Sequence, residues 1–189
     1  MNRFAPLIGI TIGVVLTIAA CGDPEEFADF QADDVDDLPA CMADEFPFEP
    51  AFLAARTRDN RTGIFLQTSP DVKSRSDVVY FELYDSDSID TETTLELGEA
   101  SVPPPDARGK MAFFASCPQD HETLKLEGTL RFEAFETGAN GIIDGHLEDG
   151  RAVNARTGET RIDDLSGSWR FLVRRGPPHE EFFALPQRP

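Results

Sequence analysis

Basic residues are scarce in this 189-residue chain, which has 17 Lys and Arg against 35 Asp and Glu and a formal net charge of −18. No run of five Lys or Arg occurs, so the composition excludes nucleic acid as the expected partner. The usual catalytic motifs are also missing: there is no Gly-x-Ser-x-Gly, His-Glu-x-x-His, phosphate-binding loop or dinucleotide fingerprint. We therefore expect a protein that is not an enzyme, and keep a small hydrolase that uses unidentified acidic residues as the alternative.

The N-terminal segment has a short basic start, Met1-Asn2-Arg3, and then an apolar run over residues 4–20. A secretory signal has this form, and the run is at the short limit for a membrane-spanning helix. The run ends in Ile18-Ala19-Ala20-Cys21, which resembles the lipobox of bacterial lipoproteins. The resemblance implies that residues 1–20 are a cleaved signal peptide and that lipid is attached to the thiol of Cys21.

This resemblance implies a membrane-anchored protein of the cell envelope, with its domain in the periplasm or at the cell surface. Each buried CH₂ contributes about 0.8 kcal/mol, so several acyl chains give a permanent anchor. Gly22 follows the cysteine, whereas the enteric sorting rule associates Asp at that position with the inner membrane. We therefore expect attachment to the outer membrane through the N-terminal lipid, with another envelope protein as a candidate partner.

Two further cysteines, Cys41 and Cys117, complete the three in the chain. Because the space outside the cytoplasmic membrane is oxidising, this even pair predicts one disulfide. It would close a loop of about 75 residues, which the chain-entropy model credits with roughly 4 kcal/mol. The alternative is that Cys41, Cys117 and His121 bind a metal, or that Cys117 is a nucleophile. That set lacks a fourth ligand.

Residues 21–40 are rich in Asp and Glu and contain no Lys or Arg. Like charges resist collapse, so this segment is predicted to be a lipidated N-terminus followed by an acidic linker. Four apolar residues lie at approximately helical spacing and leave a short amphipathic helix as an alternative: Phe27, Phe30, Val35 and Leu38. The folded domain is expected to cover residues 41–186.

The expected domain consists of short aromatic and β-branched runs separated by Gly, Pro, Asn and Asp. This pattern predicts an all-β fold, a single antiparallel β-sandwich or barrel-like domain of about seven to nine strands. We expect a hairpin that pairs residues 52–58 with 64–68, and a strand over 77–85. The most regular alternation follows residue 123 and predicts three neighbouring antiparallel strands.

Each of those three strands carries a glycine, Gly128, Gly145 or Gly167, at a core-facing position between two apolar residues. Such glycines predict a strongly bent sheet or a large neighbour over each gap. The alternative is the floor of a cavity, which would make the protein a carrier of an apolar ligand. Gly167-Ser168-Trp169 is similar to the Gly-x-Trp motif of lipocalins, but that motif lies on the first strand of the family. We expect Trp169 to be a core residue.

The candidate binding residues lie in the strand over 77–85 and in the loop that follows. Three of them are expected to face outward from the strand: Tyr80, Glu82 and Tyr84. Four acidic residues follow: Asp85, Asp87, Asp90 and Glu92. We expect a solvated acidic turn and no cofactor here, because the glycine and final glutamate of an EF-hand are missing; the alternative is that calcium binds the oxygen ligands of this loop. The tyrosines also suit recognition of a protein partner.

Overall fold

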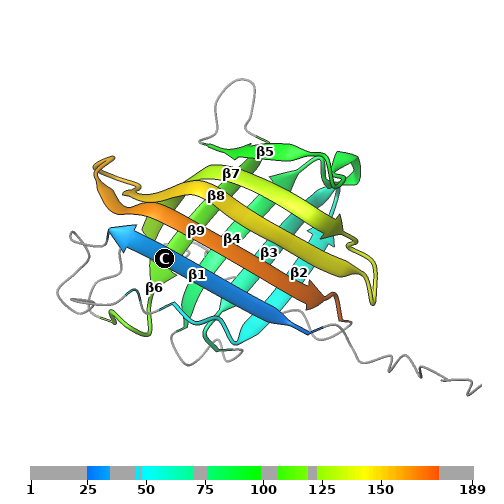
Figure 1. Ribbon diagram of the computed structural model, residues 1–189, viewed down its shortest axis with the longest axis horizontal. Coiled ribbons are helices and arrows are strands. Elements are labelled where there is room, and N and C mark those ends of the chain that lie inside the picture. The colour runs from blue at the N-terminus through cyan, green and yellow to red at the C-terminus, as the bar shows by residue number, and fades with distance from the viewer. Residues whose placement is uncertain are drawn as a thin grey trace, which may run out of the picture.

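The computed structural model of the chain describes residues 25–34, 46, 48–69, 76–98, 106–118 and 123–174. These residues form nine strands and one 3-10 turn, η2 (Ser86–Ser88) (Figure 1). The strands are β1 (Phe27–Asp34), β2 (Phe52–Arg58), β3 (Arg61–Gln67), β4 (Asp77–Tyr84), β5 (Thr94–Leu97), β6 (Ala107–Phe113), β7 (Thr123–Phe135), β8 (Ile142–Asn154) and β9 (Thr160–Leu172). The all-β prediction is confirmed. None of the helical structure in these residues is long and apolar enough to cross a membrane.

The strands belong to one sheet with the order β1-β9-β8-β7-β5-β6-β4-β3-β2. Every pairing is antiparallel except a short contact between β5 and β6. The first part of β7 pairs with β6 and a later part with β5. The sheet curls into a nearly closed barrel (Figure 1), whose two edges approach each other where Phe30 of β1 meets Phe48, just before β2. The prediction of three antiparallel strands after residue 123 is confirmed by β7, β8 and β9.

The first strand corrects the prediction of an acidic linker over residues 21–40. Phe27–Asp34 form β1, which pairs with β9 from Phe27 opposite Arg170 to Asp34 opposite Asp163. Phe30 is 5% exposed in the core, whereas Asp29 lies at the alternate, outward position. The strand therefore leaves this acidic side chain in solvent while it buries a phenylalanine. The folded domain begins before residue 41, and the helix alternative is wrong for Phe27 and Phe30; Val35 and Leu38 lie outside the described residues.

The predicted hairpin is confirmed, with a shorter turn than expected. Asp59 and Asn60 have φ angles of 51° and 59°, and two consecutive left-handed residues are typical of a type I′ turn. Asp and Asn tolerate this conformation better than other residues with a side chain. Gly63 was expected in the turn, but it lies inside β3.

The interior of the barrel is packed around Trp169, which is fully buried. Its ring stacks on Phe81 of β4 with centroids 5.0 Å apart and on Phe30 of β1 at 6.0 Å. Phe132 of β7 meets it edge-on at 6.4 Å. Because β4 and β9 are not neighbours in the sheet, the contact with Phe81 joins strands across the barrel. The prediction that Trp169 is a core residue is confirmed.

Large side chains cover two of the three core-facing glycines. A Cβ at Gly145 would lie 2.8 Å from the ring of Phe132, and one at Gly167 would clash with the ring of Phe30. Gly128 has a φ of 130° and lies where the register of β7 and β8 shifts. Covering side chains and local irregularity therefore explain these glycines, as predicted, and these contacts give no support to a cavity floor.

A buried carboxylate fixes the turn that carries Cys117. Asp77 is 2% exposed, and its Oδ1 accepts hydrogen bonds from the backbone N–H groups of Ala115 at 2.7 Å and Ser116 at 3.0 Å. Its other oxygen accepts a bond from the Ser116 hydroxyl. Cys117 follows at 1% exposure. Cys21, Cys41 and His121 lie outside the described residues, so the disulfide and the metal alternative stay predictions.

Candidate functional site

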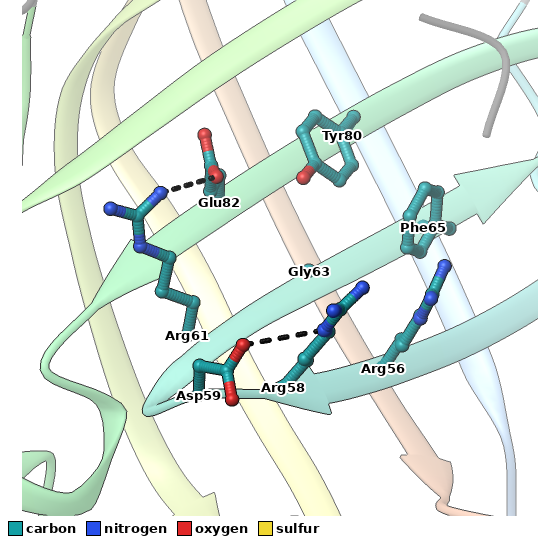
Figure 2. A pocket seen from close by; sticks show the side chains of 8 residues that line it. All are labelled: Arg56, Arg58, Asp59, Arg61, Gly63, Phe65, Tyr80 and Glu82. Carbon is teal, nitrogen blue, oxygen red and sulfur yellow. Dashed lines mark ion pairs between the residues drawn. The ribbon is translucent and has the colours of Figure 1, made fainter. Parts of the chain in front are cut away.

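The outer face of β2, β3 and β4 carries an open depression of about 430 Å³. Eight residues line it: Arg56, Arg58, Asp59, Arg61, Gly63, Phe65, Tyr80 and Glu82 (Figure 2). Three arginines from one hairpin are a notable concentration in a chain with 17 basic residues and a net charge of −18. The depression is therefore a locally cationic feature of an acidic protein.

Gly63 creates this depression because it has no side chain. In the register of the sheet it lies between Arg56 of β2 and Glu82 of β4. A Cβ at position 63 would lie 3.0 Å from the ring of Phe65 and 3.1 Å from that of Tyr80. The rings of Phe65 and Tyr80 pack at 4.7 Å and form an aromatic side next to the glycine. A larger residue at position 63 would fill the space.

Tyr84 supports one rim of the depression. Two guanidinium groups contact its ring, with the Cζ of Arg61 at 5.0 Å and that of Arg108 at 5.5 Å from the ring centroid. Its hydroxyl donates a hydrogen bond to Oε2 of Glu82 at 2.8 Å. Burial, and then the bond to Glu82, raises the pKa of Tyr84 to about 12. The phenol therefore stays protonated near neutral pH and serves as a donor, not as a base.

Alkaline titration should resolve Tyr84, because the chain has only two tyrosines. We expect one phenolate absorbance step with a midpoint near the folded-state pKa of about 12, and its loss in Tyr84→Phe. The folded-state pKa of about 12 exceeds the ordinary value of 10.0, so the contribution of Tyr84 to stability is full below pH 10 and declines as pH rises towards 12. Tyr80→Phe, the matched control, should keep the upper step. Complete ionisation of both tyrosines below pH 11 would contradict the prediction.

The three outward-facing residues expected from the sequence lie at this site. Tyr80 and Glu82 line the depression and Tyr84 supports it. The sequence interpretation missed the arginines of the hairpin. Arg56 and Arg58 are two residues apart on β2, and a basic pair at strand spacing in an acidic chain is the signal that could have revealed them.

The first two acidic residues of the following loop contact the hairpin turn. Oδ1 of Asp85 accepts a hydrogen bond from the side-chain amide of Asn60 at 2.7 Å. The backbone N–H of Asp87 donates to Oδ1 of Asn60, also at 2.7 Å. Asp85 has a left-handed backbone with a φ of 52°. These bonds attach the loop to the turn between β2 and β3.

The other two acidic residues belong to a local turn. Oδ1 of Asp90 accepts bonds from the hydroxyl of Thr93 at 2.7 Å and the backbone N–H of Glu92 at 3.0 Å. The bond from Thr93 is the main cause that lowers the pKa of Asp90. Across the described ranges, no group of three or more His, Cys, Asp or Glu gathers to hold a metal ion. The hydrogen bonds of Asp90 fit an acidic turn, and the calcium alternative stays a prediction.

A second open depression, of about 420 Å³, lies over β5, β7, β8 and β9. Its lining is largely acidic, and Arg151 within it is paired with Glu127 at 2.6 Å. His146 lines neither depression; its Nε2 lies 3.5 Å from Glu148 on the outer face of β8. His121 and His179 lie outside the described residues. Among the described residues, neither depression joins a histidine to a nucleophile.

No family model, curated protein or solved structure matches the chain. A guanidinium group is permanently charged and presents a planar fork of donors that fits carboxylate and phosphate oxygens. The arrangement suits binding of an anion.

Proposed function

We propose that the chain is a lipid-anchored cell-envelope protein with a non-catalytic binding role. The lipobox-like Ile18-Ala19-Ala20-Cys21 supports the anchor, and Gly22 supports the outer membrane. The observation that carries the binding role is the depression on β2, β3 and β4, where three arginines from one hairpin surround Gly63. The disulfide between Cys41 and Cys117 is part of this proposal, since it suits an oxidising compartment.

The groups at the depression favour binding over catalysis. A guanidinium cannot accept a proton at neutral pH, so the arginines cannot act as general bases. Tyr84, with its pKa raised to about 12, stays protonated. Glu82 accepts the hydroxyl of Tyr84 through one oxygen and lies 3.8 Å from Arg61 through the other. The carboxylate of Glu82 therefore positions Tyr84 and Arg61.

Substitution of Cys21 tests the anchor. We expect mass spectrometry of the native protein to find an acylated Cys21 as its first residue, with residues 1–20 removed. Cys21→Ala should abolish acylation and cleavage at this site, because no thiol remains to accept the lipid. Gly22→Asp is the matched control and should keep the acyl group while moving the protein to the inner-membrane fraction. An uncleaved native chain, or an unmodified thiol at Cys21, would contradict the proposal.

A further inference from the structure

We propose that the β2–β3 hairpin is an oxyanion site for the phosphate group of a ligand, held chiefly by Arg58 and Arg61. The inference rests on the binding role proposed above and gives its ligand class. It deepens that role because the oxygens of a phosphate group can accept hydrogen bonds from more than one of the arginines that the hairpin places together.

The hairpin places two positively charged residues at opposite positions of its strand pair, and in the view of Figure 2 their guanidinium groups lie on either side of Gly63. Arg58 and Arg61 are direct partners across the pair of strands, and like charges in this position destabilise a sheet. Arg56 is the next outward residue on β2, roughly 7 Å further along the strand. A phosphate group carries up to two negative charges, and its oxygens can accept from two guanidinium forks at once. Its binding would convert the repulsion into attraction.

The acidic neighbours neutralise these two arginines only in part. Nε of Arg58 lies 3.3 Å from Oδ2 of Asp59, but their side chains are 77% and 85% exposed, so water weakens the pair. Nη1 of Arg61 is 3.8 Å from Oε1 of Glu82, a long ion pair. Each guanidinium has five N–H donors. Most donors on Arg58 and Arg61 therefore remain available to a ligand.

The surroundings hold Arg61 in position beside an open floor. The ring of Tyr84 packs under the Arg61 guanidinium at 5.0 Å, and Tyr84 in turn fixes Glu82 by a hydrogen bond. Gly63, which has no side chain, forms part of the floor of the depression; in the view of Figure 2 it lies between the Arg61 and Arg58 side chains. Glu82 is a negative charge on the same rim, and its place beside Arg61 makes it a positioning residue for that arginine.

The phosphate could belong to a lipid headgroup or to a soluble molecule. The strand pairing puts the start of β1 and the β2–β3 turn at the same end of the barrel, on the two strands that approach each other at its seam. If Cys21 carries lipid, about six residues separate it from β1, which span roughly 20 Å when extended. Headgroups of the anchoring membrane are then within reach of the hairpin. Both sources present the same phosphate oxygens, and the experiment separates them.

The first arm measures binding of inorganic phosphate to the full chain at constant ionic strength. We expect saturable binding that is at least tenfold weaker in Arg58→Gln/Arg61→Gln. Arg131→Gln/Arg156→Gln removes the same charge elsewhere and should bind as the parent does. Without phosphate, the hairpin variant should melt at or above the parent temperature, because the like-charge pair is gone. Phosphate also stabilises proteins generally; an equal rise in melting temperature in all three proteins, without saturable binding, would overturn the inference.

The second arm compares vesicles of phosphatidylglycerol with vesicles of phosphatidylcholine. A preference for phosphatidylglycerol that the hairpin variant loses and the control variant keeps identifies a lipid headgroup. Saturable binding of inorganic phosphate without that preference identifies a soluble phosphate ligand. Either result supports the site, and absence of both overturns it. If Cys21 is acylated but the chain binds no phosphate, the lipid anchor is supported and the phosphate site is overturned. If the chain binds phosphate but Cys21 is not acylated, the phosphate site is supported and the anchor is overturned.

Discussion

Replacing Trp169 with alanine is expected to lower the free energy of unfolding by about 3–5 kcal/mol, the usual cost of truncating a large buried aromatic side chain. The indole is fully buried and contacts Phe30, Phe81 and Phe132 from three different strands. Its removal leaves a cavity where the two sides of the barrel meet. Urea unfolding followed by circular dichroism measures the effect, since Trp169 is the single tryptophan of the chain and fluorescence is lost with it.

Two further variants control this measurement. Trp169→Phe keeps an aromatic ring and should recover a large part of the loss. Phe27→Ala removes a ring that is 43% exposed on β1, so we expect a change of less than about 1 kcal/mol. A loss below about 1.5 kcal/mol for Trp169→Ala would show that the barrel does not depend on this contact.

Reduction of the proposed bond between Cys41 and Cys117 is expected to cost roughly 4 kcal/mol, because it releases a loop of about 75 residues in the unfolded chain. Cys117 is 1% exposed, and the three hydrogen bonds accepted by Asp77 hold its turn in place. Unfolding with and without reductant measures the change while every side chain is kept.

The control for this experiment is Cys41→Ala/Cys117→Ala, whose stability should not respond to reductant. Thiol counting on the unfolded, unreduced protein provides an independent check. If Cys41 and Cys117 both react with a thiol reagent there, the bond does not exist and the argument from an oxidising compartment loses its support.

The strands that the sequence reveals are those in which large apolar residues alternate with polar ones. Leu165, Trp169 and Phe171 fall on one side of β9, so their alternation predicts a half-buried strand without knowledge of its neighbours. In β1 the inward positions include Ala28, Phe30 and Ala32, of which only one is large. Alanine contributes little apolar signal, and the surrounding acidic residues dominate the pattern. The hydrogen-bonded pairing with β9 makes these residues a strand, and the local sequence of β1 does not reveal that pairing.

Some residues of the candidate site can likewise be predicted from one strand alone, whereas others depend on how two strands pair. Alternation along β4 is enough to predict that Tyr80, Glu82 and Tyr84 face outward. The pairing of Arg58 with Arg61 depends on the two-residue turn between them, and a longer turn ending at Gly63 leaves Arg61 outside the strand. A shift of a few residues in one turn thus decides whether the two arginines lie opposite each other. Contacts of this kind follow from register, which single-strand patterns do not encode.

The attachment of β1 also determines how the domain responds to mechanical force. In the described part of the chain β1 is hydrogen-bonded to β9 alone. Just before it, Glu26 accepts bonds from the Leu172 backbone at 3.2 Å and from Arg174 at 3.0 Å. Tension applied to the preceding residues along the strand axis loads this whole ladder in shear, so its bonds resist together instead of opening one at a time. A pull across the sheet would unzip the strand at a much lower force.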